Sequence, residues 1–559
     1  MKLHRQPLRP AAAATLLALA MLAGSVAACQ GCHATTNQPA VNEGEAQLGA
    51  PTIRLYIVSD LAGALEPCGC VKDQLGGLDH LAAWIEAERA KAPTSALLLA
   101  GPTFFMEPVL KDDHRAQDTV KAKTIAQSLK QLGVLAVAPG KNDWAAGPKA
   151  MTEIGSESGG AFLAGNVTSA GQPLAGHVVR EINGVKVGVV GVSAPDRAEG
   201  GAPEGVTASP AIEAVKAHVA DAKKEGAKVV VVLAAVGRGE AKRIADMVPD
   251  VTAIVVGSPG GSGDANTEAP PPERIGNVLI AETGNHLTTV AVLDLYVRDN
   301  GFAFADATGL ELGRKRTELS RRIDELRGRI AQWESQGSIV DGGNAPPPIS
   351  KEDLDARKAD VAKLEAERAA LDARPPPAKG SFFRYTIQEV RDALGKDKGV
   401  TDKMLAYYKE VNEHNKVEFA SRVPRPAPAG APSYVGVDAC VTCHLDPGEV
   451  WEKTAHAHAY ATLSKQFKEY NLDCVGCHVT GYDLPGGSTV THVAKLENVG
   501  CEVCHGPGSK HAASPKKVAI PIAKPQPDAC LACHHPPHVH TFDAKQKMQE
   551  ILGPGHGKK

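Results

Sequence analysis

The chain has 559 residues, of which 43% are hydrophobic and 22% charged, with a formal net charge of −3 at pH 7. This length is too great for one hydrophobic core and predicts several domains. The even charge balance and an aromatic content of 4% argue against a nucleic-acid-binding protein. Eight of the twelve cysteines and twelve of the twenty histidines lie after residue 439, so the most informative motifs are expected there.

Residues 1–28 are typical of an export signal. Basic residues at the start precede an apolar stretch, Ala11–Ala23, and small residues lead into Cys29. The string Val26–Cys29 resembles the bacterial lipobox, which implies a lipid on Cys29 and makes residues 29–50 a polar tether. We therefore expect a protein exported to the periplasmic side or to the cell surface and held at the membrane by a lipid anchor.

Two alternatives remain open at this end of the chain. Ordinary cleavage at the small residues would release a soluble periplasmic protein. Cys29–His33 also spells C-x-x-C-H, a motif that attaches c-type haem, and a fifth haem there would exclude the lipid because one thiol cannot carry both. No other run of about 18 apolar residues is present, so no membrane-spanning helix is expected.

Residues 51–309 alternate apolar runs with helical stretches. This alternation predicts β-α-β units around largely buried sheets. Asn183-Gly184, between two strand-like runs, indicates a hairpin. The expected strands are Ile53–Ser59, Ala96–Ala100, Val134–Ala138, Ala161–Val167, Val229–Val236, Thr252–Gly257, Val278–Glu282 and Thr288–Val297.

Four strings in this region carry a resemblance: Leu55–Asp60, Gly76–Leu78, Ala164–Val167 and Gly184–Val192. In their order they resemble the periplasmic 5′-nucleotidases, of the calcineurin-like metallophosphoesterase class. The resemblance implies a four-layer α/β/β/α sandwich with two metal ions at the carboxyl ends of the strands.

Most residues that would bind those metal ions are replaced. Asp60 and Asp143 remain, but two carboxylates cannot supply the roughly eight ligands that a pair of divalent ions needs. Phosphoesterase activity is therefore not expected, and a 5′-nucleotidase-like hydrolase with altered metal ligands stays as an alternative. The replaced positions are Ala62, Pro102, Lys141, Asn142, Ala235 and the run Ser258–Gly260.

The loop after the first expected strand carries the string Glu66–Cys70, which reads Glu-Pro-Cys-Gly-Cys. Open α/β folds place their sites at the carboxyl ends of strands, so this loop should lie where the metal ions would have been. The string resembles a group of nucleotidase-like proteins in which selenocysteine can replace one cysteine. A C-x-C disulfide closes a small, strained ring and is comparatively oxidising. We interpret Cys68 and Cys70 as a redox pair and as the candidate catalytic site, with a metal-ligand pair and a structural disulfide as alternatives.

Three segments follow this region. Apolar residues that recur on one helical face predict an antiparallel helical hairpin over residues 310–375. Residues 376–423 are expected to form a connecting strand and helix. Residues 424–433 contain four prolines and are expected to be a linker.

Residues 434–559 contain four copies of C-x-x-C-H, the attachment signature of c-type haem. The two thiols add to one porphyrin, which places the following histidine against the iron as its proximal ligand. Zinc sites and redox dithiols share parts of this pattern, but four copies behind an export signal favour four covalently bound haem c groups. A mainly α or irregular domain, with the haems as much of its core, is expected. The attachment residues are Cys440, Cys443 and His444; Cys474, Cys477 and His478; Cys501, Cys504 and His505; and Cys530, Cys533 and His534.

Trp451–Leu463 and Val499–His511 resemble the cytochrome c-554-type multihaem proteins. The resemblance implies stacked haems for electron transfer, with His456, His511 and His556 as distal iron ligands. It also implies that one haem can lack a sixth protein ligand.

Met548 is the only methionine in this domain, so bis-histidine ligation should dominate. His492, His538 and His540 stay unassigned. The combined interpretation is an exported multihaem cytochrome, fused to a metal-free phosphoesterase-like scaffold, that exchanges electrons with redox partner proteins. Its haems would pass electrons to or from Cys68 and Cys70, and the alternative is a plain electron-transfer module with the scaffold as a docking surface.

Overall fold

The computed structural model describes most of the chain from Gly49 to His556. The described residues are 49–67, 74–196, 201–257, 266–301, 303–336, 350–371, 377, 379–539 and 542–556. The predicted export signal and lipidation site, the motif Cys29–His33, the pair Cys68 and Cys70, the run Ser258–Gly260 and His540 lie outside these residues. From Gly49 onward the chain forms one unit by its internal contacts.

Seven strands form the first sheet, with parallel strands on one side of its centre and antiparallel strands on the other. The last long strand comes from the segment that the sequence predicts as a connector, and its eight residues pair in register with the neighbouring strand. That segment therefore completes this sheet. In spatial order the strands are β15 (Ala305–Asp306), β16 (Phe382–Glu389), β14 (Thr289–Tyr296), β1 (Ile53–Ser59), β2 (Ser95–Ala100), β3 (Val134–Ala138) and β4 (Ala161–Phe162).

A second sheet of six strands is also mainly parallel. The hairpin predicted at Asn183-Gly184 is confirmed, because Ile182 pairs with Val185 across it. The strands in spatial order are β12 (Glu273–Ile275), β13 (Val278–Ala281), β11 (Ala253–Val256), β10 (Val229–Ala235), β8 (Val185–Ser193) and β7 (His177–Ile182). A small third sheet contains β6 (Gln172–Pro173), β5 (Val167–Ser169) and β9 (Val206–Ala208).

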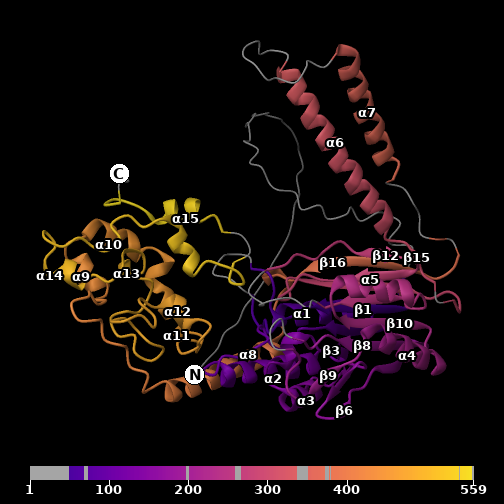
Figure 1. The fold of residues 1–559 in the computed structure, drawn as a ribbon, viewed down its shortest axis with the longest axis horizontal. Helices are drawn as coiled ribbons and strands as arrows, with labels where there is room; N and C mark the ends of the chain where they lie inside the picture. The colour runs from indigo at the N-terminus through magenta and orange to yellow at the C-terminus, as the bar shows by residue number, and fades with distance from the viewer. Residues whose placement is uncertain are drawn as a thin grey trace, which may run out of the picture. The chain divides into compact units, whose positions relative to one another are not determined.

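The two large sheets pack face to face, and helices cover both outer faces. Along β1, Leu55 and Ile57 enter the core between the sheets, whereas Tyr56 and Val58 face the outer core, as the two-residue period of a strand requires. The α/β/β/α sandwich expected from the sequence is therefore confirmed (Figure 1). Its helices are α1 (Leu78–Arg89), α2 (Arg115–Gln131), α3 (Pro148–Glu157), α4 (Ala211–Lys224), α5 (Arg238–Met247) and α8 (Lys398–Glu418).

One expected strand is divided in the structure. The run predicted over Ala161–Val167 forms β4 and β5, which belong to different sheets. The chain turns between them where Leu163 crosses from the first sheet toward β8, and Gly191 leaves room for it because a Cβ there would lie 2.3 Å from the Leu163 carbonyl oxygen. Apolar runs cannot reveal such a change of sheet.

The segment after β15 forms two long helices, α6 (Leu310–Gln336) and α7 (Lys351–Ala369), which pack against each other (Figure 1). Ile323, Ile330 and Val361 are the buried residues of their shared interface. The Ser350 hydroxyl caps α7 by accepting a hydrogen bond from the Asp353 backbone N–H. The remaining described surface of both helices is polar and exposed.

The C-terminal region has short helices and a small apolar cluster of Phe419, Leu472, Val475, Val479 and Val490. In the described part of the chain, no helix is both long and apolar enough to cross a membrane. The short helices are α9 (Val437–Val441), α10 (Leu445–Glu452), α11 (Ala459–Ser464), α12 (Val475–His478), α13 (Cys501–His505), α14 (Ser509–Ala513) and α15 (Ala544–Ile551).

Candidate haem and redox sites

Each C-x-x-C-H motif overlaps a short helix, and the third motif, Cys501–His505, forms α13 in full. In the first and fourth motifs, the backbone N–H of the histidine donates to the carbonyl of the first cysteine, at 3.0 Å for His444 and 2.9 Å for His534. A turn of this kind brings residues four apart onto one face. The local fold therefore presents the thiols and the imidazole of a motif to one ligand.

Three histidines of these motifs stand opposite a second imidazole. The ring centroids are 6.2 Å apart for His444–His511, 6.2 Å for His505–His556 and 6.1 Å for His456–His534. Stacked rings in van der Waals contact would be much closer, at about 3.5–4 Å. Two metal–imidazole bonds of about 2 Å, together with the ring radii, instead give about 6 Å. The spacing fits one iron atom between each pair of rings.

Backbone carbonyls orient several of these imidazoles. The Nδ1 atoms of His478, His505 and His511 lie 2.7, 2.8 and 2.7 Å from the carbonyl oxygens of Ala459, Ile522 and Val518. A carbonyl oxygen only accepts, so Nδ1 carries the proton and Nε2 keeps its lone pair. Nε2 is thus the atom prepared for iron in each ring.

Burial keeps further ring nitrogens available for a metal. It lowers the pKa of His456, His534 and His556, and a neighbouring imidazole lowers each pKa further. Metal binding requires the neutral ring, so this shift favours ligation. The Trp451 indole N–H donates to the Val499 carbonyl at 2.8 Å and holds the segment of His456 in place.

Other histidines have different surroundings. Within the described residues, His478 has no second imidazole in a ring pair. His492 lies beside the hydroxyl of Thr491, with its Nδ1 3.0 Å away, and His538 meets His535 edge-on at 5.4 Å between centroids. The His535–His538 centroid distance is shorter than the 6.1–6.2 Å of the three pairs, and His492 forms no ring pair with another imidazole among the described residues. The sequence could not distinguish the histidines that face a motif histidine from the others, because only the tertiary fold decides which histidines lie opposite a motif.

The cysteines of different motifs are also neighbours. Cys440 lies within hydrogen-bonding range of Cys501, and Cys477 lies within the same range of Cys533. Cys504 is close enough to Cys530 for an electrostatic interaction between the two side chains. These contacts connect the first motif with the third, the third with the fourth and the fourth with the second.

The carboxyl edge of the sandwich carries a different kind of site. Asp143, a residue of the predicted metal position, is fully buried and accepts hydrogen bonds from the backbone N–H groups of Thr103, Phe104 and Gly140, at 2.6–3.0 Å. Burial raises the pKa of Asp143 to about 6, and the backbone N–H groups oppose that shift. Its oxygens are occupied by the loops and do not point into an open site.

The loops at this edge approach one another closely. A Cβ on Gly101 would lie 2.4 Å from an Asp143 carboxylate oxygen, and one on Gly257 would lie 2.1 Å from the Gly101 carbonyl oxygen. Among the described residues, no group of three or more histidine, cysteine, aspartate or glutamate side chains could hold a metal ion.

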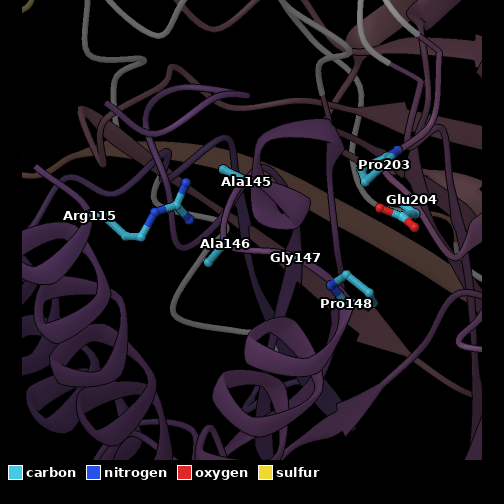
Figure 2. A pocket seen from close by; sticks show the side chains of 7 residues that line it. All are labelled: Arg115, Ala145, Ala146, Gly147, Pro148, Pro203 and Glu204. Carbon is cyan, nitrogen blue, oxygen red and sulfur yellow. The ribbon is translucent and has the colours of Figure 1, made fainter. Parts of the chain in front are cut away.

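A pocket of about 440 Å³ opens nearby (Figure 2). Arg115 and Glu204 reach toward it from opposite sides, and the backbone from Ala145 to Pro148 lies between them. Its lining holds one acidic and one basic side chain and neither cysteine nor histidine. Nothing in it matches the ligands of a phosphoesterase.

The sandwich instead meets the second haem motif. The carboxylate of Glu66, two residues before Cys68, forms an ion pair with Lys468 at 2.5 Å. Lys121 on α2 forms another with Asp473 at 2.6 Å, directly before Cys474. Cys68 and Cys70 lie outside the described residues, so only the beginning of their loop is located.

Four motifs, three of whose histidines face another imidazole, characterise the C-terminal region as a c-type cytochrome domain. Residues 439–506 match the family model described as cytochrome c554 and c-prime. Cytochrome c-554 of Nitrosomonas europaea is 38% identical over 96 residues, which cover 14% of this chain and 40% of that protein. The chain thus spans two fifths of the length of this curated relative.

Solved structures are similar to the sandwich at low identity. The sulfate thiohydrolase SoxB of Thermus thermophilus is 18% identical, with 45% of this chain and 55% of that chain covered and a TM-score of 0.38. A 5′-nucleotidase precursor from Thermus thermophilus is 22% identical, with coverage of 45% and 52% and a TM-score of 0.36. The calcineurin-like phosphoesterase YfkN of Bacillus subtilis is 16% identical, with coverage of 44% and 86% and a TM-score of 0.36.

Replacing Asp143 by alanine should destabilise the sandwich. Three buried backbone N–H groups would lose their acceptor, and we expect the free energy of unfolding to fall by about 3 kcal/mol or more. Thermal unfolding followed by circular dichroism measures the change. Asp250→Ala, which alters a half-exposed surface pair, should change the same quantity by less than about 0.5 kcal/mol. Equal unfolding temperatures for the two variants would contradict the structural role of Asp143.

Replacing His456, His511 or His556 by alanine should each convert one haem from low spin to high spin, because the iron loses its second imidazole. Electron paramagnetic resonance of the oxidised protein measures the low-spin fraction. His492→Ala is the matched control and should leave that fraction unchanged. The ligand assignment is wrong if His492→Ala removes a low-spin signal or if His511→Ala does not.

Proposed function

We propose that this chain is an exported cytochrome that carries electrons through four covalently bound haem c groups, between a redox partner protein and the sandwich domain. The observation that carries this proposal is the spacing of the ring pairs His444–His511, His505–His556 and His456–His534, which suits one iron each. A bound haem c supplies a one-electron carrier. The remaining site is the second motif, whose His478 forms no ring pair with another imidazole among the described residues.

The cysteine contacts support a linear order of the haems. Cys440 neighbours Cys501, Cys504 neighbours Cys530, and Cys533 neighbours Cys477. In this order the first motif lies at one end and the second motif at the other. Electrons would therefore enter or leave through the haem at Cys440 and reach the sandwich through the haem at Cys474.

The second motif is the one whose preceding segment contacts Glu66, two residues before Cys68 in the sequence. The Glu66–Lys468 ion pair links the start of that loop to the segment that leads into Cys474. This contact favours Cys68 and Cys70 as the redox site over the alternative of a plain electron-transfer module. Reduction of a disulfide between them would take two electrons and two protons and give two thiols, so two one-electron carriers would be oxidised for each disulfide opened.

The location of the protein follows from its N-terminus in this proposal. The basic and apolar residues 1–28 would direct export, and a lipid on Cys29 would hold the protein at the membrane. An exported site suits a disulfide between Cys68 and Cys70, since disulfides persist in oxidising compartments. A hydrolytic function gains no support, because the Asp143 carboxylate is occupied by backbone N–H groups.

A pyridine haemochrome assay with protein quantitation should give four haems per chain, since the C-terminal domain has four C-x-x-C-H motifs. The intact mass should add four haems and a lipid to the processed chain. A ratio near five would assign a haem to Cys29–His33 and overturn the lipid anchor. A ratio of three or fewer would mean that one of the motifs is empty.

The Cys68→Ser/Cys70→Ser variant should accept two electrons fewer per chain than the unchanged protein in a reductive titration. The reason is that the haems remain while the disulfide is lost. The visible spectrum reports the haems separately, and the Asp250→Asn variant serves as a control with intact cysteines. Equal electron counts for all three proteins would leave the sandwich as a docking scaffold.

A further inference from the structure

The segment that leads into Cys474 is fixed to the sandwich domain by buried hydrogen bonds. The Gln117 side-chain oxygen on α2 accepts the Leu472 backbone N–H at 3.0 Å and the Asn415 side-chain amide at 3.0 Å. The same Asn415 amide donates to the Tyr470 carbonyl at 2.9 Å. Gln117 and Asn415 are each only 1% exposed. The backbone before Cys474 therefore cannot move independently of α2 and α8.

Two ion pairs cross between the sandwich and this segment, on either side of Tyr470. Glu66 pairs with Lys468, whose ammonium lies 4.3 Å from the centre of the Tyr408 ring. Lys121 pairs with Asp473. The Lys468 and Lys121 side chains are 10% and 16% exposed and their partners Glu66 and Asp473 are 34% and 38% exposed, so water screens the two pairs only in part. Glu66, Lys121, Asp473 and Lys468 are also the charged groups that act on the Cys474 thiol, whose pKa burial raises to about 12.

The described contacts of Cys440 and Cys501 differ from those of Cys474. Their charged neighbour is Glu502, which belongs to the C-terminal domain and is itself 2% exposed. Glu502 accepts hydrogen bonds from the backbone N–H groups of Gly436 and Gly508. At these cysteines the first and third motifs are therefore surrounded by residues of their own domain. The second motif, in contrast, has charged neighbours that belong to the sandwich.

We propose that the haem at Cys474 and Cys477 is bound between two domains, and that Glu66 and Lys121 of the sandwich form part of its pocket and set its reduction potential. The inference rests on the proposed haem at this motif. It gives the sandwich a function that needs no catalytic metal. Its α2 and the turn at Glu66 would supply charged side chains beside the haem at Cys474 and Cys477.

The two ion pairs predict shifts of opposite sign. Reduction adds negative charge to a haem, so removing the Glu66 carboxylate leaves the Lys468 cation unbalanced and favours the reduced state. Removing the Lys121 cation leaves Asp473 unbalanced and favours the oxidised state. A unit charge about 10 Å away at an effective dielectric constant of about 20 changes such an equilibrium about tenfold.

Spectroelectrochemical titration of the full, haem-loaded chain tests the proposal. In Glu66→Gln, one of the haem reduction steps should move to higher potential by a tenfold change in its equilibrium constant, or ~59 mV, while the other steps hold. In Lys121→Met the same step should move to lower potential by a similar amount. That step is identified as the one missing in Cys474→Ala/Cys477→Ala, which lacks the second haem.

The ion pair Lys223–Asp250 of the sandwich, which joins α4 to the turn after α5, provides matched controls. Asp250→Asn and Lys223→Met make the same changes of charge and should move no haem step. The proposal is overturned if Glu66→Gln and Lys121→Met leave the second haem's potential unchanged, if both shift it in one direction, or if all haems shift equally. Haem content measured on the same samples separates these results from a failure of the proposed function, which would appear as an empty second motif.

Discussion

An iron atom bonded to two imidazoles fixes the separation of the two rings, and the C-terminal domain is arranged around that separation. Each of its three ring pairs joins histidines more than fifty residues apart in the chain, at 6.1–6.2 Å between centroids. The apolar cluster of this domain is small, and one of its members, Val475, lies inside the second motif, with Leu472 before the motif and Val479 directly after it. Small apolar cores stabilise a fold weakly. In the proposed haem-loaded protein, covalent attachment and the histidine ligands would therefore be the constraint on which the helices α9 to α15 depend.

The sandwich shows how a binding edge can become a structural one. Asp143 keeps the position of a metal ligand in the pattern, yet its carboxylate holds three loop N–H groups. Gly101 and Gly257 let the loops come closer than any side chain would allow. Backbone donors here take the role that a cation has in a metal site, since both satisfy a buried carboxylate. The Asp143 carboxylate and the loops around it thereby support the fold.

One stretch of the C-terminal region contacts the sandwich through both hydrogen bonds and ion pairs. Between Lys468 and Cys474 the chain is held by Gln117 and Asn415 and is flanked by the pairs Glu66–Lys468 and Lys121–Asp473. Buried ion pairs stabilise little by themselves, because removing the charges from water is costly. They do fix the local potential around whatever lies beside them. A role in tuning a redox group accounts for these pairs better than a role in stability.

The sequence by itself determined the local chemistry of this protein. C-x-x-C-H is a contiguous motif, so its residues, the helical turn that presents them and the class of cofactor can be recognised without a fold. The strands of the sandwich were equally accessible, because buried parallel strands are continuous apolar runs. The tertiary structure alone decided the relations between distant residues. It pairs His444 with His511 and leaves His492 beside Thr491, it splits the run Ala161–Val167 between two sheets, and it brings Glu66 to Lys468. These choices depend on packing between segments remote in the chain, and no local pattern of residues encodes them.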